Sequence, residues 1–240
     1  MSPRFTIISV VFNAVDDIQR TVESVIQQKY QNLEYIIIDG GSTDGTLEVL
    51  DKYKKAGVIK YKSEPDNGIY DAINKGVALA SGEFVNILMM GDYHDPVFLE
   101  RMNDYLGDFD FAYSGCKCVT SNGEVIPSLP GPLTSIKDVS GMPFAHNTLM
   151  VRRQICLNFP YSQRFRYASD FDFICLLLSN RFSGIYIPEC LSSYETGGVG
   201  NSFLSVFESF IILRKYRQLT FRSIWVLFKQ VIITAKVKYL

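Results

Sequence analysis

The chain has 240 residues, of which 47% are hydrophobic and 20% charged, and its formal net charge is −1. This composition excludes an intrinsically disordered chain, and the length is enough to bury a core in one large domain or one and a half. The charge is unevenly distributed, because seven basic residues and no acidic residue follow Glu208. Residues 1–208 therefore carry 17 basic and 25 acidic side chains. A basic tail on an acidic body indicates an anionic surface as a partner.

The beginning of the chain and its cysteines indicate a reducing compartment. The segment "MSPRFTIISVVF" leads directly into a strand-like run and lacks the basic, apolar and small-residue zones of a signal peptide. The five cysteines are odd in number, and the closest pair, Cys116 and Cys118, has a spacing that zinc sites do not use. We therefore expect a cytoplasmic protein with reduced cysteines.

In chain order, the first elements are a strand and a helix. Residues 5–12 form an apolar run rich in β-branched side chains, which predicts a buried strand, and residues 16–28 show helical spacing of their apolar side chains. The same pattern recurs three times. The strands of these repeats are predicted at 33–38, 58–63 and 83–89, and their helices at 46–55, 68–80 and 96–106. Four such alternations indicate an α/β fold with a mostly parallel, Rossmann-like sheet covered by helices on both faces.

Polar residues gather in the loops at the carboxyl ends of these four strands. The loops contain Asn13, Asp39, Asp66 and Asp92, and ligands of such sheets bind at this edge. Each residue by itself also fits an ordinary turn or helix cap. However, three carboxylates at consecutive strand ends need a cation or hydrogen-bond donors to stay ionised together. The pattern favours a binding site, with the turn "MMGDYHDP" around Asp92 as a candidate metal site.

Three common catalytic motifs are absent from the sequence. The glycines of "GGSTDG" do not have the G-x-G-x-x-G spacing of a nicotinamide site. No P-loop and no G-x-S-x-G nucleophile elbow occur either. The sequence therefore argues against a nicotinamide-dependent enzyme, a P-loop enzyme and a hydrolase of the nucleophile-elbow type.

The second half of the chain has a different character. Residues 109–135 contain short apolar runs among Gly, Ser and Pro, which predicts antiparallel strands and turns. The segment 144–153, "FAHNTLMVRR", predicts a buried strand that is interrupted by its His-Asn pair. Asp170 precedes a strongly apolar helix, as a cap or as a functional carboxylate. Asp172, two residues further on, is expected to form a pair or to point elsewhere.

The basic tail predicts two amphipathic helices, at 202–213 and 221–237. Four of its basic residues recur every seven positions, Lys215, Arg222, Lys229 and Lys236. Because Lys229 interrupts the longest uncharged run, no segment reaches the ~18 residues needed to span a bilayer. The helices either pack on the body with a solvated basic face or bind the surface of an anionic membrane, and their apolar side also suits a homodimer.

Seven segments together resemble one enzyme family. They are "TIISVVFNA", "YIIIDGGSTDGT", "SEPDNGIYDAINKG", "ASGEFVNILMMGD", "PFAHNTLMVRR", "YASDFDF" and "YETGGVGNS". Their order and spacing resemble those of the inverting GT-A glycosyltransferases of family two, and more narrowly of bacterial enzymes that build O-antigen, colanic acid and other exopolysaccharides. The resemblance covers about residues 5–202. It implies a nucleotide-sugar half at 1–106, an acceptor half at 107–200 and C-terminal helices at 201–240.

The resemblance implies which residues bind the nucleotide of the donor. Asp39 matches the aspartate that such enzymes use against the uracil or ribose, and Phe12 and Asn13 lie beside it in the sequence. Asp66, in the next loop, and Asp92 complete the implied nucleotide site.

The resemblance also implies a divalent cation, Mn²⁺ or Mg²⁺. Asp92 matches the last aspartate of the D-x-D-type motif, which coordinates the ion on the diphosphate. The preceding position is Gly91, where many relatives have aspartate, so Asp92 is the one protein carboxylate implied on the metal. A hard cation commonly takes its other ligands from water and phosphates. Whether His94 also contacts the metal or a phosphate is open at this point.

The remaining implied residues concern the sugar and the acceptor. Asp170 matches the second position of the family's Glu-Asp motif, whose first position is serine here, and is the implied general base. His146 and Asn147 resemble a His-Gln pair on the acceptor side, although a structural histidine is an equal interpretation. Tyr70 and Asp71 are implied to face the donor sugar, although Asp71 also fits a helix cap.

The resulting expectation is a metal-dependent, inverting transferase. It would move a sugar from a UDP-sugar to a polyprenyl-diphosphate-linked saccharide at the cytoplasmic face of the inner membrane, with no nucleic-acid partner. One alternative is an inactive module that binds a sugar nucleotide or a glycan, which the degenerate "MMGD" motif keeps open. A sugar-1-phosphate nucleotidyltransferase is a weaker alternative, because the Gly-rich, Arg-containing turn that it needs after residue 12 is missing.

Overall fold

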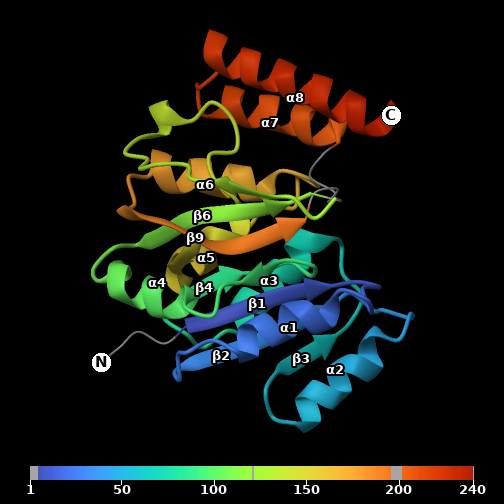
Figure 1. Cartoon of the computed structure of the whole chain (residues 1–240). Helices are drawn as coiled ribbons and strands as arrows, with labels where there is room; N and C mark the ends of the chain where they lie inside the picture. The colour runs from blue at the N-terminus through green and yellow to red at the C-terminus, as the bar shows by residue number, and fades with distance from the viewer. Residues whose placement is uncertain (1–4, 121, 196–201, 240) are drawn as a thin grey trace.

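The computed structural model describes residues 5–120, 122–195 and 202–239 as one central sheet with flanking helices (Figure 1). The strands are β1 (Phe5–Val11), β2 (Leu33–Asp39), β3 (Lys60–Ser63), β4 (Phe84–Ile87), β5 (Tyr93–His94), β6 (Phe111–Val119), β7 (Val125–Ser128), β8 (Met150–Arg152) and β9 (Gly184–Glu195). The helices are α1 (Ile18–Ile26), α2 (Thr46–Lys55), α3 (Ile69–Leu79), α4 (Phe98–Leu106), α5 (Arg153–Asn158), α6 (Ser169–Ser179), α7 (Phe203–Lys215) and α8 (Phe221–Tyr239). Two short 3₁₀ turns, η1 (Ile136–Asp138) and η2 (His146–Thr148), lie between β7 and β8. The sheet order is β3-β2-β1-β4-β8-β6-β9-β5, with β7 paired to β6.

The first half of the sheet is parallel, as the four strand-helix repeats predict. β1 pairs in parallel with β2 and β4, and β2 pairs in parallel with β3. Alternate side chains of β1 enter two cores: Ile8 packs in the core that contains Ile73 of α3, and Ile7 in the core that contains Val22 of α1. Because helices cover both faces, the carboxyl ends of these strands and their loops are held in place.

The second half of the sheet is mixed. β8 runs antiparallel to β4 and β6, whereas β9 runs parallel to β6. The antiparallel strands predicted within residues 109–135 are confirmed by the pairing of β6 with β7. The short β5, which follows β4 in the chain, pairs with β9 at the far side of the sheet. The loop after β4 is therefore tied to β9, and residues from both halves meet there.

The interruption predicted at the His-Asn pair of segment 144–153 is confirmed, but the expectation of a strand before that pair is wrong. Residues 146–148 form the turn η2, and only 150–152 pair in the sheet. The reason is the side chain of Asn86 in β4, which donates hydrogen bonds to the backbone carbonyls of Asn147 and Leu149, both at 2.9 Å. Because a side chain binds these carbonyls, the backbone before residue 150 follows it instead of a strand ladder.

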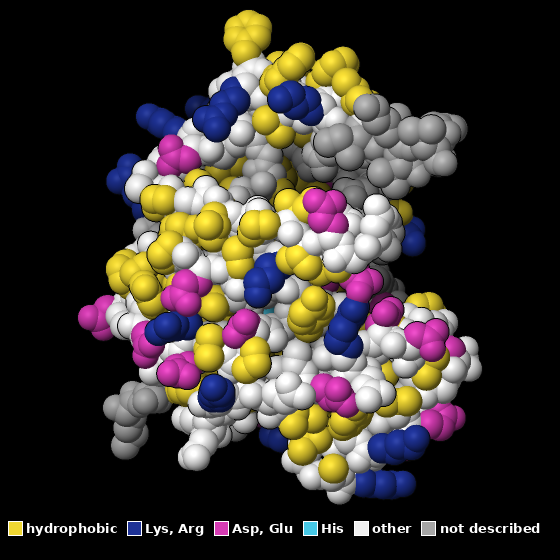
Figure 2. All heavy atoms as spheres, in the orientation of Figure 1, with side chains coloured by type: hydrophobic (Ala, Val, Ile, Leu, Met, Phe, Trp, Pro, Cys, Tyr) yellow, Lys and Arg dark blue, Asp and Glu magenta, His cyan; other side chains and the backbone are white. Residues whose placement is uncertain are grey.

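The two predicted C-terminal helices are confirmed as α7 and α8, which lie together beyond α6 (Figure 1). α8 buries small or polar side chains, Ser223 and Thr234, beside Leu227, and exposes large apolar ones. The exposed apolar face of α8 consists of Phe221, Ile224, Trp225, Phe228, Val231 and Ile232. Figure 2 shows hydrophobic and basic side chains together at this end of the molecule. In the part of the chain that the structure describes, no helix is both long and apolar enough to cross a bilayer.

Candidate active site

Asp39 ends β2 at the carboxyl edge of the parallel strands. It is fully buried, and its carboxylate accepts hydrogen bonds from the backbone N–H groups of Gly41 at 2.9 Å and Ser42 at 3.0 Å. The hydroxyl groups of Ser42 and Ser63 also donate to it, at 2.5 and 2.6 Å. Both carboxylate oxygens are thus used to fix the β2 loop against β3. A contact of Asp39 with a nucleotide stays a prediction.

Phe12 and Asn13 form the loop after β1. Asn13 has a positive φ of 48°, and its side-chain oxygen accepts a hydrogen bond from the backbone N–H of Thr43 at 2.9 Å. Its own backbone N–H donates to the Ser42 hydroxyl at 2.8 Å. The turn leaves Phe12 64% exposed at the edge of the sheet. An exposed aromatic ring in such a place suits stacking on a nucleobase.

Asp66 lies beside that ring. A Cβ atom built on Gly40 would be 2.6 Å from Oδ2 of Asp66 and 3.4 Å from the ring of Phe12. The glycine therefore provides the space in which the Asp66 carboxylate adjoins the exposed ring. The other oxygen, Oδ1, accepts the backbone N–H of Gly68 at 2.8 Å. Of the predicted nucleotide-binding residues Asp39 and Asp66, only Asp66 adjoins Phe12 and has a carboxylate oxygen without a hydrogen bond to the described residues.

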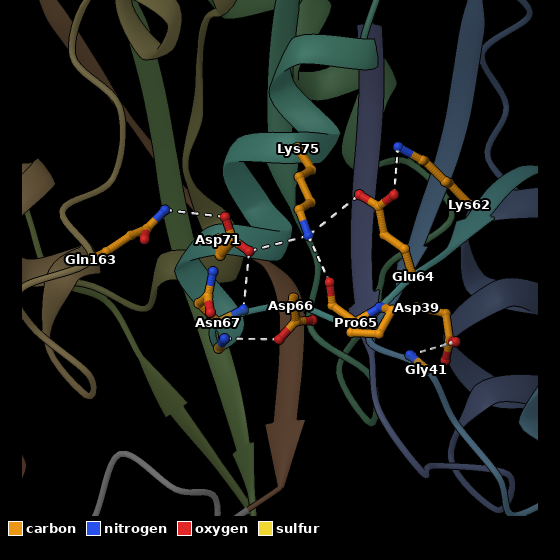
Figure 3. Close-up of polar contacts among 11 residues, drawn as sticks. Asp39, Gly41, Lys62, Glu64, Pro65, Asp66, Asn67, Asp71, Lys75 and Gln163 are labelled. Carbon is orange, nitrogen blue, oxygen red and sulfur yellow. Dashed lines mark hydrogen bonds and ion pairs between the residues drawn. The ribbon is translucent and has the colours of Figure 1, made fainter.

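Lys75 of α3 fastens the loop that carries Asp66 (Figure 3). Its ammonium group donates to the carbonyl of Pro65 at 3.0 Å and forms ion pairs with Asp71 at 3.1 Å and Glu64 at 3.4 Å. Asp71 also accepts the backbone N–H of Asn67 at 3.0 Å and the side-chain amide of Gln163 at 3.1 Å. Asp71 is therefore occupied in holding this loop, and its contact with a donor sugar stays a prediction.

Asp92 follows β4 after Gly91, whose φ of +93° favours glycine. Its Oδ2 accepts a hydrogen bond from the side-chain amide of Asn147 at 3.0 Å. Burial raises the pKa of Asp92 to about 7, although Asn147 and Arg20 oppose this shift. Arg20 is itself held by the carbonyl of Gly91 at 2.6 Å and by an ion pair with Glu195. The effects of Asn147 and Arg20 on the pKa of Asp92 are therefore smaller than the effect of burial.

His94 is a buried residue two positions after Asp92. Its Nδ1 and Nε2 atoms lie 2.8 Å from the hydroxyl of Ser192 and 2.9 Å from the side-chain oxygen of Asn86. Burial lowers the pKa of His94 to about 3, so the ring is neutral, and Nε2–H donates to Asn86 because that oxygen only accepts. Both nitrogens are engaged inside the protein, which answers the open question: His94 positions Asn86 and does not face a metal.

Asp170 lies in the first turn of α6. Its Oδ1 accepts a hydrogen bond from the hydroxyl of Tyr70 at 3.2 Å and from the backbone N–H of Phe171 at 2.8 Å. Burial raises the pKa of Tyr70, so its hydroxyl keeps the proton that it donates. The expectation that Asp172 forms a pair is confirmed by its ion pair with Lys215 at 2.7 Å.

The turn η2 lies between Asp92 and the tyrosines that adjoin Asp170. Asn147 donates to Asp92, while its neighbour His146 lies 2.8 Å from the hydroxyl of Tyr161 through Nε2. Burial lowers the pKa of His146, and the negative charge of Asp170 opposes this shift. Tyr161 in turn stacks on Tyr70, whose hydroxyl donates to Asp170. Asn147 therefore contacts Asp92 directly, while its neighbour His146 is connected to Asp170 through the two tyrosines, and a shared site for the two carboxylates stays a prediction.

The comparison with known families decides the identity of the fold and its site. The pattern of "Glycosyl transferase family 2" matches residues 6–160, which contain the loops of β1 to β4 and the turn η2. The chain belongs to glycosyl transferase family 2. The sequence-based resemblance is therefore confirmed at the level of the family.

Several named relatives of this family 2 chain are glycosyltransferases. It is 27% identical over 223 residues to a PGL/p-HBAD biosynthesis glycosyltransferase of Mycobacterium bovis, a match that covers 85% of this chain and 81% of the relative. An uncharacterized glycosyltransferase of Mycobacterium tuberculosis is 42% identical over 92 residues, or 38% of this chain. This second match spans only 35% of the relative's length.

Solved glycosyltransferase structures share the fold of this family 2 chain, which confirms the predicted GT-A fold. Staphylococcus aureus TarS 1-349 in complex with UDP-GlcNAc matches with a TM-score of 0.69 and 18% identity, over 89% of this chain and 65% of that one. The mannosyltransferase PcManGT of Pyrobaculum calidifontis, in complex with GDP-Man and Mn²⁺, matches with a TM-score of 0.69 and 15% identity. That match covers all of this chain and 77% of the other.

The residues around Asp92 fit a divalent cation that is held mainly by its substrate. Among the described residues, no group of three or more His, Cys, Asp and Glu side chains could hold a metal ion by itself. Asp92 offers a partly exposed carboxylate whose pKa is raised, mainly by burial. Beside it, the buried Oδ1 of Asn147 has no hydrogen-bond partner in the described chain. One carboxylate and one vacant acceptor suit a cation that keeps waters and binds phosphates.

Proposed function

We propose that the chain is an inverting, metal-dependent glycosyltransferase that moves a sugar from a UDP-sugar to a lipid-linked saccharide. The observation that carries this proposal is the connection through the turn η2. Asn147 donates to Asp92, and the adjacent His146 contacts Tyr161, which stacks on Tyr70, the hydrogen-bond donor to Asp170. A transferase of this type needs both carboxylates within one site. One must serve the diphosphate leaving group, and the other must serve the incoming hydroxyl.

In the proposed mechanism, Phe12 stacks on the nucleobase and Asp66 accepts a hydrogen bond from its N–H group. Asp92 would hold Mn²⁺ or Mg²⁺, which when bound neutralises the charge that grows on the leaving diphosphate. Asp170 takes the proton of the acceptor hydroxyl on the opposite face of the sugar. Tyr70 directs the Asp170 carboxylate through its hydrogen bond at 3.2 Å, which leaves Oδ2 for the acceptor.

The choice of UDP is supported by the family resemblance and by the structure of TarS, which is a complex with UDP-GlcNAc. PcManGT is a complex with GDP-Man instead, so GDP-sugars belong in the same test. Sugar contacts of Tyr70, Asp71, His146 and Asn147, and the division of the chain at residues 106 and 200, remain parts of the proposal.

The lipid-linked acceptor and a peripheral position on the cytoplasmic face of the inner membrane are supported by the tail. The exposed apolar face of α8 includes Phe221, which is 95% exposed, and Trp225. Three basic residues lie in α8 or in the turn before it: Arg217, Arg222 and Lys229. No acidic residue follows Glu208. Such a helix binds in the plane of an anionic bilayer surface. The alternative is that this apolar face of α8 forms the interface of a homodimer.

The test is donor turnover. The protein is incubated with Mn²⁺, a panel of UDP- and GDP-sugars, and a polyprenyl-diphosphate-linked N-acetylglucosamine, and nucleotide release and product are measured. Asp170→Asn should keep UDP binding and lose transfer, because only the proton acceptor is removed. Near-normal transfer by Asp170→Asn contradicts the base assignment. Binding without release indicates an inactive binding module, and release of pyrophosphate indicates a nucleotidyltransferase.

A further inference from the structure

The segment just before α6 has an unusual partner. α6 begins at Ser169, and the residue at its N-cap, Ala168, has no side chain that can accept a hydrogen bond. Instead, three consecutive backbone N–H groups, those of Arg166, Tyr167 and Ala168, donate to the carboxylate of Glu208 at 2.8, 2.8 and 2.9 Å. Glu208 lies in α7, about forty residues further along the chain. A carboxylate from another helix thus fixes the segment that leads into α6.

The same face of α7 holds α6 at a second point. Lys215 follows Glu208 by two helical turns, and its ammonium group donates to both carboxylate oxygens of Asp172, at 2.7 and 3.0 Å. The hydroxyl of Tyr216 donates to the backbone carbonyl of Asp172 at 3.3 Å. Asp172 is buried, whereas the Lys215 side chain is half exposed. α7 therefore contacts α6 at two points, just before the helix begins and at Asp172 in its first turn.

In the chain, Asp170 lies between these two points of contact with α7. Its hydrogen-bond donors, Tyr70 and the backbone of Phe171, do not belong to α7, so α7 acts on it through the backbone of α6. The direction of the Asp170 carboxylate depends on where the first turn of α6 sits, and Glu208 fixes the approach to that turn. We propose that Glu208 is a positioning residue for Asp170, so that α7 is part of the catalytic apparatus. This inference rests on the proposed role of Asp170 as general base.

A positioning role predicts more than a loss of stability. If Glu208 only stabilised the fold, its replacement would lower the fraction of active protein, and every activity would fall in the same proportion. A misdirected base instead favours attack by water over attack by the acceptor hydroxyl. The ratio of sugar nucleotide hydrolysed to saccharide product would then rise, while binding of the donor at Phe12 and Asp66 stays the same.

The experiment compares Glu208→Gln with Ser209→Ala in the full chain. Ser209 is the next residue of α7, and its hydroxyl donates within that helix, to the Ser205 carbonyl at 2.8 Å. Glu208→Gln should lower kcat for transfer by about 10- to 100-fold, leave KM for the sugar nucleotide unchanged and raise the hydrolysis-to-transfer ratio. Glu208→Asp, which keeps the charge, should lie between this variant and the wild type. Ser209→Ala should match the wild type in all three quantities.

A second measurement does not need the acceptor. Amide hydrogen exchange of the segment 166–171 should accelerate in Glu208→Gln, while exchange in the core strands β1 and β4 stays protected. If this segment exchanges as in the wild type, or if the folded variant keeps wild-type transfer and coupling, the proposal is wrong. Failure of the proposed function itself looks different, because Asp170→Asn would then remain active.

Discussion

Two carboxylates at opposite ends of the parallel strands have opposite environments: Glu34 is buried, whereas Asp92 is partly exposed. Glu34, near the start of β2, accepts hydrogen bonds from the Thr6 hydroxyl at 2.8 Å, the Ser81 backbone at 2.7 Å and the Lys60 ammonium at 2.9 Å. Burial alone would raise the pKa of Glu34, but these donors outweigh it and hold the pKa at about 2. Asp92, after β4, has too few such donors, and its pKa is about 7. The donors around Glu34 outweigh the effect of its burial on the pKa, whereas those around Asp92 do not.

The strongest test of this contrast is the loss of Asp92. Asp92→Ala should lower Mn²⁺-dependent release of UDP from a UDP-sugar by about 10²- to 10³-fold, because a group that stabilises the leaving charge is removed. Steady-state kinetics with and without Mn²⁺ measure this effect. Glu34→Gln is the matched control at the other end of the strands, and the folded fraction of that variant should keep wild-type turnover. Equal losses of activity in the two variants would contradict the proposed difference between Asp92 and Glu34.

The two carboxylates should also affect stability with opposite signs. The pKa of Glu34 is lower in the folded state, so its contribution is present above about pH 4.5 and is lost as the pH falls toward 2. Because Lys60 is largely exposed and screened by solvent, we expect Glu34→Gln to cost only about 1–2 kcal/mol at pH 7. The pKa of Asp92 is raised, so the stability of the metal-free protein falls as the pH rises from about 4 to 7.

Urea unfolding of the metal-free proteins measures these signs. At pH 8, Asp92→Asn should be more stable than the wild type, since the unfavourable charge is absent, whereas Glu34→Gln should be less stable. Between pH 5 and 2.5 the wild type should lose more stability than Glu34→Gln. Stabilisation by Glu34→Gln at neutral pH would contradict the assignment of that carboxylate to the fold.

A smaller effect separates a second pair of carboxylates, Asp39 and Asp66. Asp66→Asn should weaken UDP binding by about fivefold, which corresponds to one hydrogen bond, with little change in unfolding. Asp39→Asn should mainly destabilise the protein, because the buried Asp39 binds the β2 loop. Isothermal titration with UDP and thermal unfolding distinguish the two. The interpretation fails if Asp39→Asn folds normally and loses UDP affinity more than Asp66→Asn does.

The sequence predicts those elements whose signals are local. The four strand-helix repeats and the two tail helices follow from apolar spacing within each segment, and the structure contains all of them. The turn η2 does not follow from such spacing, because the side chain that shapes it, Asn86, lies some sixty residues earlier. A polar residue inside the buried run "EFVNIL" is the available signal. Periodicity reports which face a residue occupies but not which distant group it bonds.

The same limit applies to the candidate site. The loop positions of Asp39, Asp66 and Asp92 follow from strand order, so sequence reasoning places them correctly at one edge. It does not reveal that Asp39 is saturated by the loop it begins, because one of the donors, Ser63, comes from another strand. Nor does it find Glu208, because the backbone groups that its carboxylate binds lie about forty residues earlier in the chain.

The apolar face of α8 has a practical consequence for handling the protein. In buffer without detergent, water contacts four large side chains of this face: Phe221, Ile224, Trp225 and Phe228. Association of two molecules through these side chains lowers the free energy, because it removes apolar surface from water. A purified sample that elutes as several species would then indicate non-specific association through this face and not a defined oligomer. Sedimentation repeated across detergent concentrations separates the two, because micelles compete for the apolar face but leave a true subunit interface intact.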